Sequence, residues 1–161
     1  MTTQIRITEA APSDAAELAS IHIAARRDAM PYLPTLHSDE DTVRWFVARL
    51  AEIPAAFRVA RTDRDIVGYF VLHDGQLQDL YVQPHHQGRG VGSALLDAAK
   101  SLSPRKIVLS TFQQNTEARA FYEARGFREI GRTDGDNEER LPDIQYEWDG
   151  AVTRTTRRYC R

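Results

Sequence analysis

The stretch that decides the fold runs from Gln76 to Leu96 and reads QLQDLYV at 76–82, QPHH at 83–86 and QGRGVGSALL at 87–96. Its first segment has the composition of a β-strand, and the segment from Gly90 onwards has that of a helix. The turn between them is rich in glycine and carries one positive charge, Arg89. Glycine lets the backbone approach a ligand closely, and the first N–H groups of a helix attract anions. We therefore predict that this stretch binds the pyrophosphate of a cofactor.

The chain has the size and composition of one folded domain. Its 161 residues are 42% hydrophobic and 27% charged, which are ordinary values for a globular protein. The net charge of −2 gives no overall field to attract nucleic acid or an anionic membrane. Cys160 is the only cysteine, so we expect no internal disulfide and no metal centre, and a cytoplasmic location. No apolar run approaches the roughly 20 residues that span a bilayer, and the N-terminus lacks a signal-peptide pattern.

The residues before this stretch predict two helices and an antiparallel meander. Residues 5–7 alternate like an edge strand. A helix from about Pro12 to Met30 ends before Pro31 and Pro34, which leave 30–37 as a loop. A second helix starts at Ser38, and its expected apolar face consists of Val43, Phe46, Val47 and Leu50. Strands are expected at 57–60, 66–72 and 76–82, joined by turns at 62–65 and 73–75.

The residues after it predict a second helix–strand alternation. A helix at 90–102 is followed by a continuous apolar strand at 106–111, expected to be parallel to the strand at 76–82. A helix then runs from Asn115 to Ala124, with Gly126 as its cap. Strands at 127–131 and 144–148 flank a polar loop at 134–142. The predicted order is β-α-α-β-β-β-α-β-α-β-β with a mixed sheet, in one domain over 1–150 followed by a basic, mobile tail at 151–161.

Two familiar phosphate-binding patterns fail at named positions. A P-loop ends in Gly-Lys followed by Ser or Thr, and no such triplet follows the turn. A dinucleotide fingerprint begins with Gly88-Arg89-Gly90, but its third glycine position is occupied by Ser93. It also requires an acid after the next strand to bind the ribose. The strand at 106–111 is followed by Phe-Gln-Gln, so this pattern is excluded as well.

A third pattern fits both the turn and a later segment. Gln87-x-x-Gly90-x-Gly92, directly after the strand, resembles the acyl-coenzyme-A signature of the GCN5-related N-acetyltransferases. The later segment has Asn115, Ala118, AFYE at 120–123 and GF at 126–127. The resemblance covers 66–127 closely and the remainder in outline. It implies the acyl-CoA N-acyltransferase fold, an α/β fold with a mixed sheet splayed at its centre, and acetyl-CoA as cofactor.

The resemblance also implies roles for individual residues. Main-chain groups of Leu80 and Val82 would hold the pantetheine and acetyl groups, and the N–H of Val82 would polarise the thioester carbonyl. Tyr122 would share a proton with the leaving thiolate; the alternative is that it packs in the core, as we expect of Phe121. The implied cofactor-binding residues are Leu80, Tyr81, Val82, Gln87, Gly88, Arg89, Gly90, Val91, Gly92, Ser93, Asn115 and Tyr122. Gln87 and Arg89 could instead belong to a solvated turn, and Asn115 has the alternative or additional role of a helix N-cap.

The general base is not evident from the sequence. An alkyl amine arrives as an ammonium ion and must lose a proton before it attacks the thioester. Where some family members place a glutamate on the strand before the turn, this chain has Gln76 and Gln78. Asp79 is the acid of this strand and, with Tyr122, a candidate catalytic residue, although its side chain is expected on the opposite face from Gln78. A water chain to an acid of the last loop or strand is the alternative, the candidates being Glu138, Glu139, Asp143 and Glu147. His85 and His86 are expected to be surface residues of the turn.

The binding site for the amine that accepts the acetyl group is expected to be formed by regions that vary within the family. Its candidates are Tyr32, His37, Trp45, Phe46, Glu138 and Glu139. For Trp45 and Phe46 the alternative is core packing, and for the acidic loop it is a solvated hairpin tip.

The resulting hypothesis is an acetyl-CoA-dependent N-acetyltransferase that acts on a primary amine of a small molecule, amino acid or peptide, and forms a homodimer. The alternative is an acyl-CoA-binding sensor module of the same fold, because a base is missing. Nucleic-acid binding through the arginine-rich tail is disfavoured by the acidic net charge and the lack of interleaved aromatic residues.

Overall fold

The computed structural model describes residues 4–152, and the chain divides into two compact units. Unit 1 comprises residues 1–73 and 78–99, and unit 2 comprises residues 74–77 and 100–161. No helix in the described part of the chain is long and apolar enough to cross a lipid bilayer.

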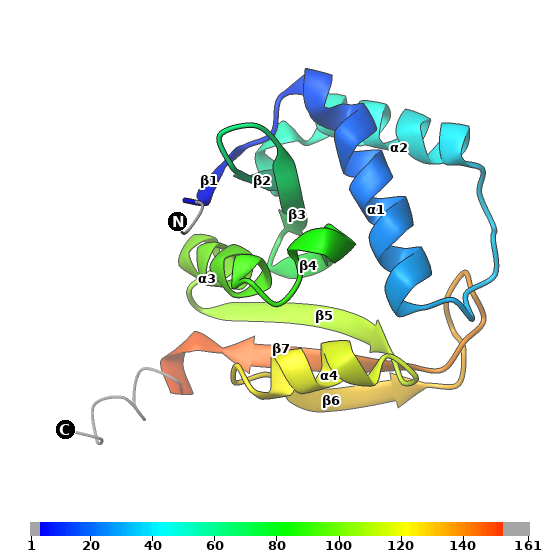
Figure 1. Cartoon of the computed structure of the whole chain (residues 1–161). Helices are drawn as coiled ribbons and strands as arrows, with labels where there is room; N and C mark the ends of the chain where they lie inside the picture. The colour runs from blue at the N-terminus through cyan, green and yellow to red at the C-terminus, as the bar shows by residue number, and fades with distance from the viewer. Residues whose placement is uncertain (1–3, 153–161) are drawn as a thin grey trace. The chain divides into compact units, whose positions relative to one another are not determined.

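Unit 1 contains the two N-terminal helices and the antiparallel meander that the sequence predicts, together with most of a third helix (Figure 1). Its elements are β1 (Arg6–Glu9), α1 (Ala15–Ala29), α2 (Asp39–Glu52), β2 (Phe57–Arg61), β3 (Ile66–His73), most of β4 (Gln76–Val82) and most of α3 (Val91–Leu102). β1 pairs antiparallel with β2, and β2 pairs antiparallel with β3. Short 3-10 turns occur at Pro12–Asp14, Pro54–Ala56 and Pro84–His86.

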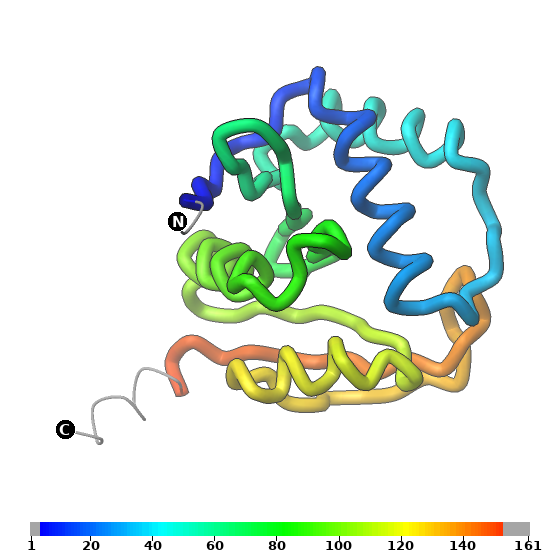
Figure 2. Tube along the Cα trace, viewed as in Figure 1, coloured from blue at the N-terminus to red at the C-terminus, as the bar shows by residue number. Residues whose placement is uncertain are grey.

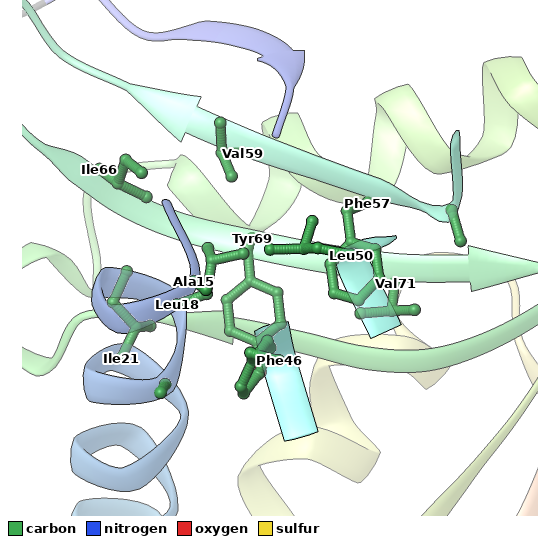
Figure 3. Packing of buried hydrophobic residues seen from close by; sticks show 12 residues of the cluster. Ala15, Leu18, Ile21, Phe46, Leu50, Phe57, Val59, Ile66, Tyr69 and Val71 are labelled. Carbon is green, nitrogen blue, oxygen red and sulfur yellow. The ribbon is translucent and has the colours of Figure 1, made fainter. Parts of the chain in front are cut away.

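The core of unit 1 lies between the two N-terminal helices and the strands of the meander. Leu18 and Ile21 of α1 point into it, and Phe46 of α2 lies against Tyr69 of β3 (Figure 3). The predicted apolar face of α2 is correct except at one position, since Val47 is 54% exposed. Consecutive residues of a helix point about 100° apart, so Val47 lies at the edge of the apolar face, and this edge is exposed to solvent. The buried stripe of α2 instead consists of Val43, Phe46 and Leu50.

Unit 2 is built on three antiparallel strands and one helix. Its elements are β5 (Lys106–Phe112), α4 (Thr116–Glu123), β6 (Arg128–Thr133) and β7 (Asp143–Asp149). β7 pairs antiparallel with β5 from Asp149 opposite Lys106 to Asp143 opposite Phe112, and with β6 along its other edge (Figure 2). A register shift between Glu129 and Gly131 interrupts the pairing of β6. The last strand is therefore central in this unit.

The strands are hydrogen-bonded in the order β1-β2-β3-β4-β5-β7-β6. β4 and β5 pair in parallel at Gln76 and Val108, both in unit 2, which confirms the predicted mixed sheet. The expected splay of these strands beyond that pair stays a prediction, as does the single domain over 1–150. The greater part of the predicted basic tail, including Cys160, lies outside the described residues.

Candidate active site

The glycine-rich turn has the backbone that its sequence predicts. Gly88 has a φ of +74° and Gly90 a φ of +83°, in the left-handed region that favours glycine. A β-carbon added at either position would meet no atom within 4 Å. The requirement for glycine therefore comes from the backbone conformation, and space remains open beside both residues. Residues 87–90 are exposed.

The turn leads directly into the first turn of α3. The N–H of Ala94 donates to the carbonyl of Gly90 at 3.0 Å, so Val91, Gly92 and Ser93 form the N-terminal turn of the helix. This end of a helix carries the positive pole of its dipole. Arg89 is exposed and adds a full positive charge, while the side-chain amide of Gln87 donates back to the carbonyl of Val82 at 3.4 Å. Open space, backbone amides and a cation together fit a pyrophosphate group.

A polar cluster lies on the face of β4 that packs against α1. The hydroxyl of Tyr69, on β3, donates to Oδ2 of Asp79, on β4, at 3.0 Å. Nδ1 of His22, on α1, lies 2.9 Å from the same hydroxyl and 3.6 Å from Asp79 Oδ2. We call these three residues the His22–Tyr69–Asp79 cluster. Its members come from three elements of unit 1 and form one connected hydrogen-bond network.

Aromatic and charged side chains surround this cluster. The ring of His22 makes edge contacts with Phe46, at 5.6 Å between centroids, and with Tyr81, at 5.3 Å. Arg26, one turn further along α1, donates to the hydroxyl of Tyr81 at 3.1 Å. Burial, followed by the neighbouring carboxylate of Asp79, raises the pKa of Tyr69 well above its usual value. The phenol of Tyr69 therefore keeps its proton and remains a hydrogen-bond donor.

The residues predicted to contact the acceptor amine differ in their exposure to solvent. Tyr32, His37 and Trp45 are exposed, and partial burial raises the pKa of Tyr32 although the nearby charge of Arg26 opposes the shift. Phe46 has no exposed surface and belongs to the core, so the suggestion that it contacts the acceptor is wrong. Its position in the buried stripe of α2 explains the difference from its neighbour Trp45.

Asn115 and Tyr122 lie at the two ends of α4 in unit 2. The side-chain oxygen of Asn115 accepts from the N–H of Ala118 at 3.2 Å, so Asn115 is the predicted N-cap. Tyr122 is only 8% exposed and packs between the rings of Phe121 and Phe127. Phe121 is only half-buried, contrary to the expectation that it packs in the core, and the guanidinium of Arg125 lies 3.9 Å from its ring centroid.

Two of the acids suggested as a base are engaged by donors within unit 2. Asp143 is buried and accepts hydrogen bonds from Thr133, Asn137 and Gln145. Glu147 lies 3.0 Å from Lys106 and 3.8 Å from Arg128. These contacts give both carboxylates a structural role: they link the β6–β7 hairpin internally and to β5. Glu138 and Glu139 lie in the connecting loop, with Glu138 exposed and Glu139 half-buried.

Sequence reasoning missed His22, Arg26 and Tyr69. His22 follows Ile21 on the apolar side of α1, and Tyr69 lies inside the apolar run of β3, so each residue by itself resembles a core position. The one available signal was a titratable side chain on a predicted buried face. Nothing in the sequence relates His22 to a strand 47 positions away.

Comparisons with known proteins agree with this geometry. The family model of the acetyltransferase (GNAT) domain matches residues 54–129. The peptidyl-lysine N-acetyltransferase YjaB of Escherichia coli is 34% identical over 98 residues, which cover 61% of this chain and 63% of that protein. The protein of the same name from Salmonella typhimurium is 35% identical over 80 residues, covering 49% of this chain and 54% of the relative. The chain thus matches less than two thirds of the length of either relative.

A solved structure agrees over a longer span. The solution structure of apo-YjaB from Escherichia coli superposes with a TM-score of 0.76, covering 90% of this chain and 97% of that chain at 24% identity. At this identity the likeness concerns the fold, and it confirms the predicted acyl-CoA N-acyltransferase architecture. The matched domain, the related sequences and the fold agree, and together they support membership of the chain in the GNAT, or GCN5-related N-acetyltransferase, family.

Proposed function

We propose that the protein transfers the acetyl group of acetyl-CoA to a primary amine by direct attack of the amine on the thioester. The observation that carries the proposal is the turn between β4 and α3, where Gly88 and Gly90 adopt positive φ beside open space and precede a helix N-terminus. Such a turn suits a pyrophosphate. Acetyl-CoA supplies an activated acyl carbon and a thiolate leaving group.

Each part of the site has a proposed role. Backbone N–H groups from Gly88 to Ser93 bind the pyrophosphate, and Arg89 adds charge. Main-chain groups of Leu80 and Val82 orient the thioester, with the N–H of Val82 polarising its carbonyl. Asn115 contacts the pantetheine arm, and Tyr122 shares its proton with the leaving thiolate. A tyrosine with a pKa of about 10 and a thiol of about 8.5 differ by roughly 2 kcal/mol, so a shared hydrogen bond suffices.

The acceptor is a primary amine of a peptide, an amino acid or a small molecule. A lysine side chain in a peptide is the first class to test, because two relatives carry the name peptidyl-lysine N-acetyltransferase. Tyr32, His37, Trp45, Glu138 and Glu139 stay the proposed acceptor contacts. A cytoplasmic location and a homodimer complete the proposal, and sedimentation analysis tests the dimer.

Calorimetry with acetyl-CoA tests cofactor binding directly. The wild type should bind, and Gly90→Ala should bind at least tenfold more weakly because alanine strains the backbone at a φ of +83°. Gly131→Ala is the matched control, since Gly131 lies on β6 without a positive φ. Absence of binding by the folded wild type at hundreds of micromolar acetyl-CoA would contradict the proposal.

A thiol-release assay across a panel of amines tests catalysis. Turnover that falls in Tyr122→Phe, with acetyl-CoA affinity retained, supports the enzyme. Tight binding without turnover of any amine supports the alternative, an acyl-CoA-binding sensor module. The alternative is kept because glutamines occupy the exposed face of β4, at Gln76 and Gln78.

A further inference from the structure

Transfer of the acetyl group to an amine requires a group near β4 that takes up a proton from this amine. An alkyl ammonium ion has no lone pair with which to attack a thioester, so one proton must leave first. Gln76 and Gln78 are amides and cannot take up this proton. The side of β4 that packs on α1, however, carries the His22–Tyr69–Asp79 cluster.

The hydrogen bonds of this cluster define the protonation of the histidine ring. The phenol of Tyr69 has one proton and donates it to the carboxylate of Asp79. Its oxygen can therefore only accept from Nδ1 of His22, at 2.9 Å. Nδ1 must carry the hydrogen, and in a neutral imidazole the other nitrogen, Nε2, then holds the lone pair. The cluster thus fixes the tautomer in which Nε2 accepts a proton.

We propose that His22 is the proton acceptor of the transfer and that Tyr69 and Asp79 position it; this rests on the acetyltransferase function proposed above. Edge contacts with Phe46 and Tyr81 hold the ring against α2 and β4, and Tyr81 lies in the chain between Leu80 and Val82, whose main chain is proposed to orient the thioester. The side chain of His22 keeps 23% of its surface exposed, so the proton can pass on to solvent. The ring contacts Tyr69 from β3, Asp79 and Tyr81 from β4, and the uncharged Phe46 from α2. Arg26 of α1 donates to the hydroxyl of Tyr81 and brings a positive charge to this group of side chains.

The protons and bonds balance as follows. One N–H proton of the ammonium ion moves to Nε2 of His22, which becomes an imidazolium ion, and the nitrogen regains its lone pair. The nitrogen then bonds to the acyl carbon while the bond from this carbon to sulfur breaks. A second proton from nitrogen goes to the thiolate, which leaves as the thiol of coenzyme A, and the imidazolium ion returns its proton to water. The charge that develops on His22 is stabilised by Asp79 Oδ2, 3.6 Å from Nδ1.

The test measures kcat/KM between pH 6 and pH 10 with the best amine of the panel. The wild type should turn over the amine at pH 7 with the help of general-base catalysis, which typically contributes about 100-fold or more. His22→Gln should therefore lose about 100-fold in kcat/KM at pH 7. Near pH 10 the variant should approach the wild type, because the amine then arrives neutral. Acetyl-CoA affinity, measured by calorimetry, should be unchanged.

Two further variants and one control separate catalysis from folding. Asp79→Asn keeps the shape of the side chain but removes its charge, and it should lower kcat at pH 7 because the imidazolium ion of His22 loses the carboxylate that stabilises it. Tyr69→Phe removes the bridging hydroxyl and should lower kcat at pH 7 with KM little changed. His73→Gln, at the exposed end of β3, is the matched histidine control and should follow the wild-type profile.

The outcomes distinguish the proposed role of His22 from the proposed acetyltransferase function. If the wild type turns over an amine and the folded His22→Gln retains the wild-type rate and pH profile, the role of His22 is wrong and the enzyme proposal stands. If the wild type turns over no amine, both proposals fall. If His22→Gln does not fold, unchanged profiles in Asp79→Asn and Tyr69→Phe would overturn the positioning role.

Discussion

Gly68, in the middle of β3, allows three elements of unit 1 to approach closely. A β-carbon at this position would lie 2.9 Å from the carbonyl oxygen of Tyr81, 3.0 Å from Leu95 and 3.2 Å from Val91. The first contact is with backbone, which cannot rotate away. Gly68→Ala should therefore destabilise the protein by about 1–3 kcal/mol, as overpacking of a core does. Urea unfolding monitored by circular dichroism measures the change.

Gly131→Ala is the matched control for this prediction. A β-carbon there would meet only the amide oxygen of Gln145, 3.0 Å away at the end of a flexible side chain. This variant should be neutral or gain up to about 1 kcal/mol from the reduced freedom of the unfolded chain. Equal unfolding midpoints for the two variants would contradict the close packing at Gly68.

At the scale of residues, the sequence predicts those positions whose chemistry is local. The glycines of the turn and the cap at Asn115 depend on neighbours a few positions away, and the structure confirms both conformations. The His22–Tyr69–Asp79 cluster depends on strand pairing and on the packing of α1, so no local sequence pattern predicts it. Its members could be placed together only after the fold was known.

Among the elements, α2 offers a test of how a helix start is specified. The hydroxyl of Ser38 accepts from the N–H of Asp41 at 3.1 Å, and three acids follow in the first turn. Ser38→Ala should cost about 1 kcal/mol of unfolding free energy, because the N–H of Asp41 loses its partner. Thermal unfolding followed by circular dichroism is the measurement. Ser38→Asn should keep the stability, since asparagine caps equally well, and a similar loss in both variants would argue against capping.

The two adjacent aromatic residues of α2 should behave in opposite ways. Phe46 is fully buried among core residues, so Phe46→Ala should cost about 3–5 kcal/mol. Trp45 is 43% exposed, so Trp45→Ala should change the unfolding free energy far less. If Trp45 contacts the acceptor as proposed, its loss should raise KM for the amine. Denaturant unfolding of both variants, with kinetics for Trp45→Ala, distinguishes these roles.

Element positions follow from the sequence because each depends on short-range rules. α1 ends before Pro31 and Pro34, and Ser38 caps the start of α2. Gly126, with a positive φ, follows the end of α4. The stripe of α2 was predicted one residue too wide, because hydrophobicity alone does not distinguish Phe46 from Val47. Strand order within unit 2 was not predicted, since it is decided by long-range pairing.

For the whole molecule, burial of Tyr69 predicts how stability depends on pH. Its pKa is raised well above 10.0 by burial and by Asp79, so above this pH the folded state holds a proton that the unfolded chain releases. The contribution is complete below the unfolded pKa and is lost as pH rises. Urea unfolding from pH 8 to pH 11 should therefore show a decline that is shallower in Tyr69→Phe. Identical slopes for the wild type and the variant would contradict this assignment.

Within unit 2, β7 is made after both of its partners, β5 and β6. During synthesis on the ribosome, each of these earlier strands keeps an unpaired edge until the last strand has emerged. Such edges readily pair with strands of other chains. Unit 2 must therefore complete its folding after translation of β7, and slow release of this segment would favour association between nascent chains.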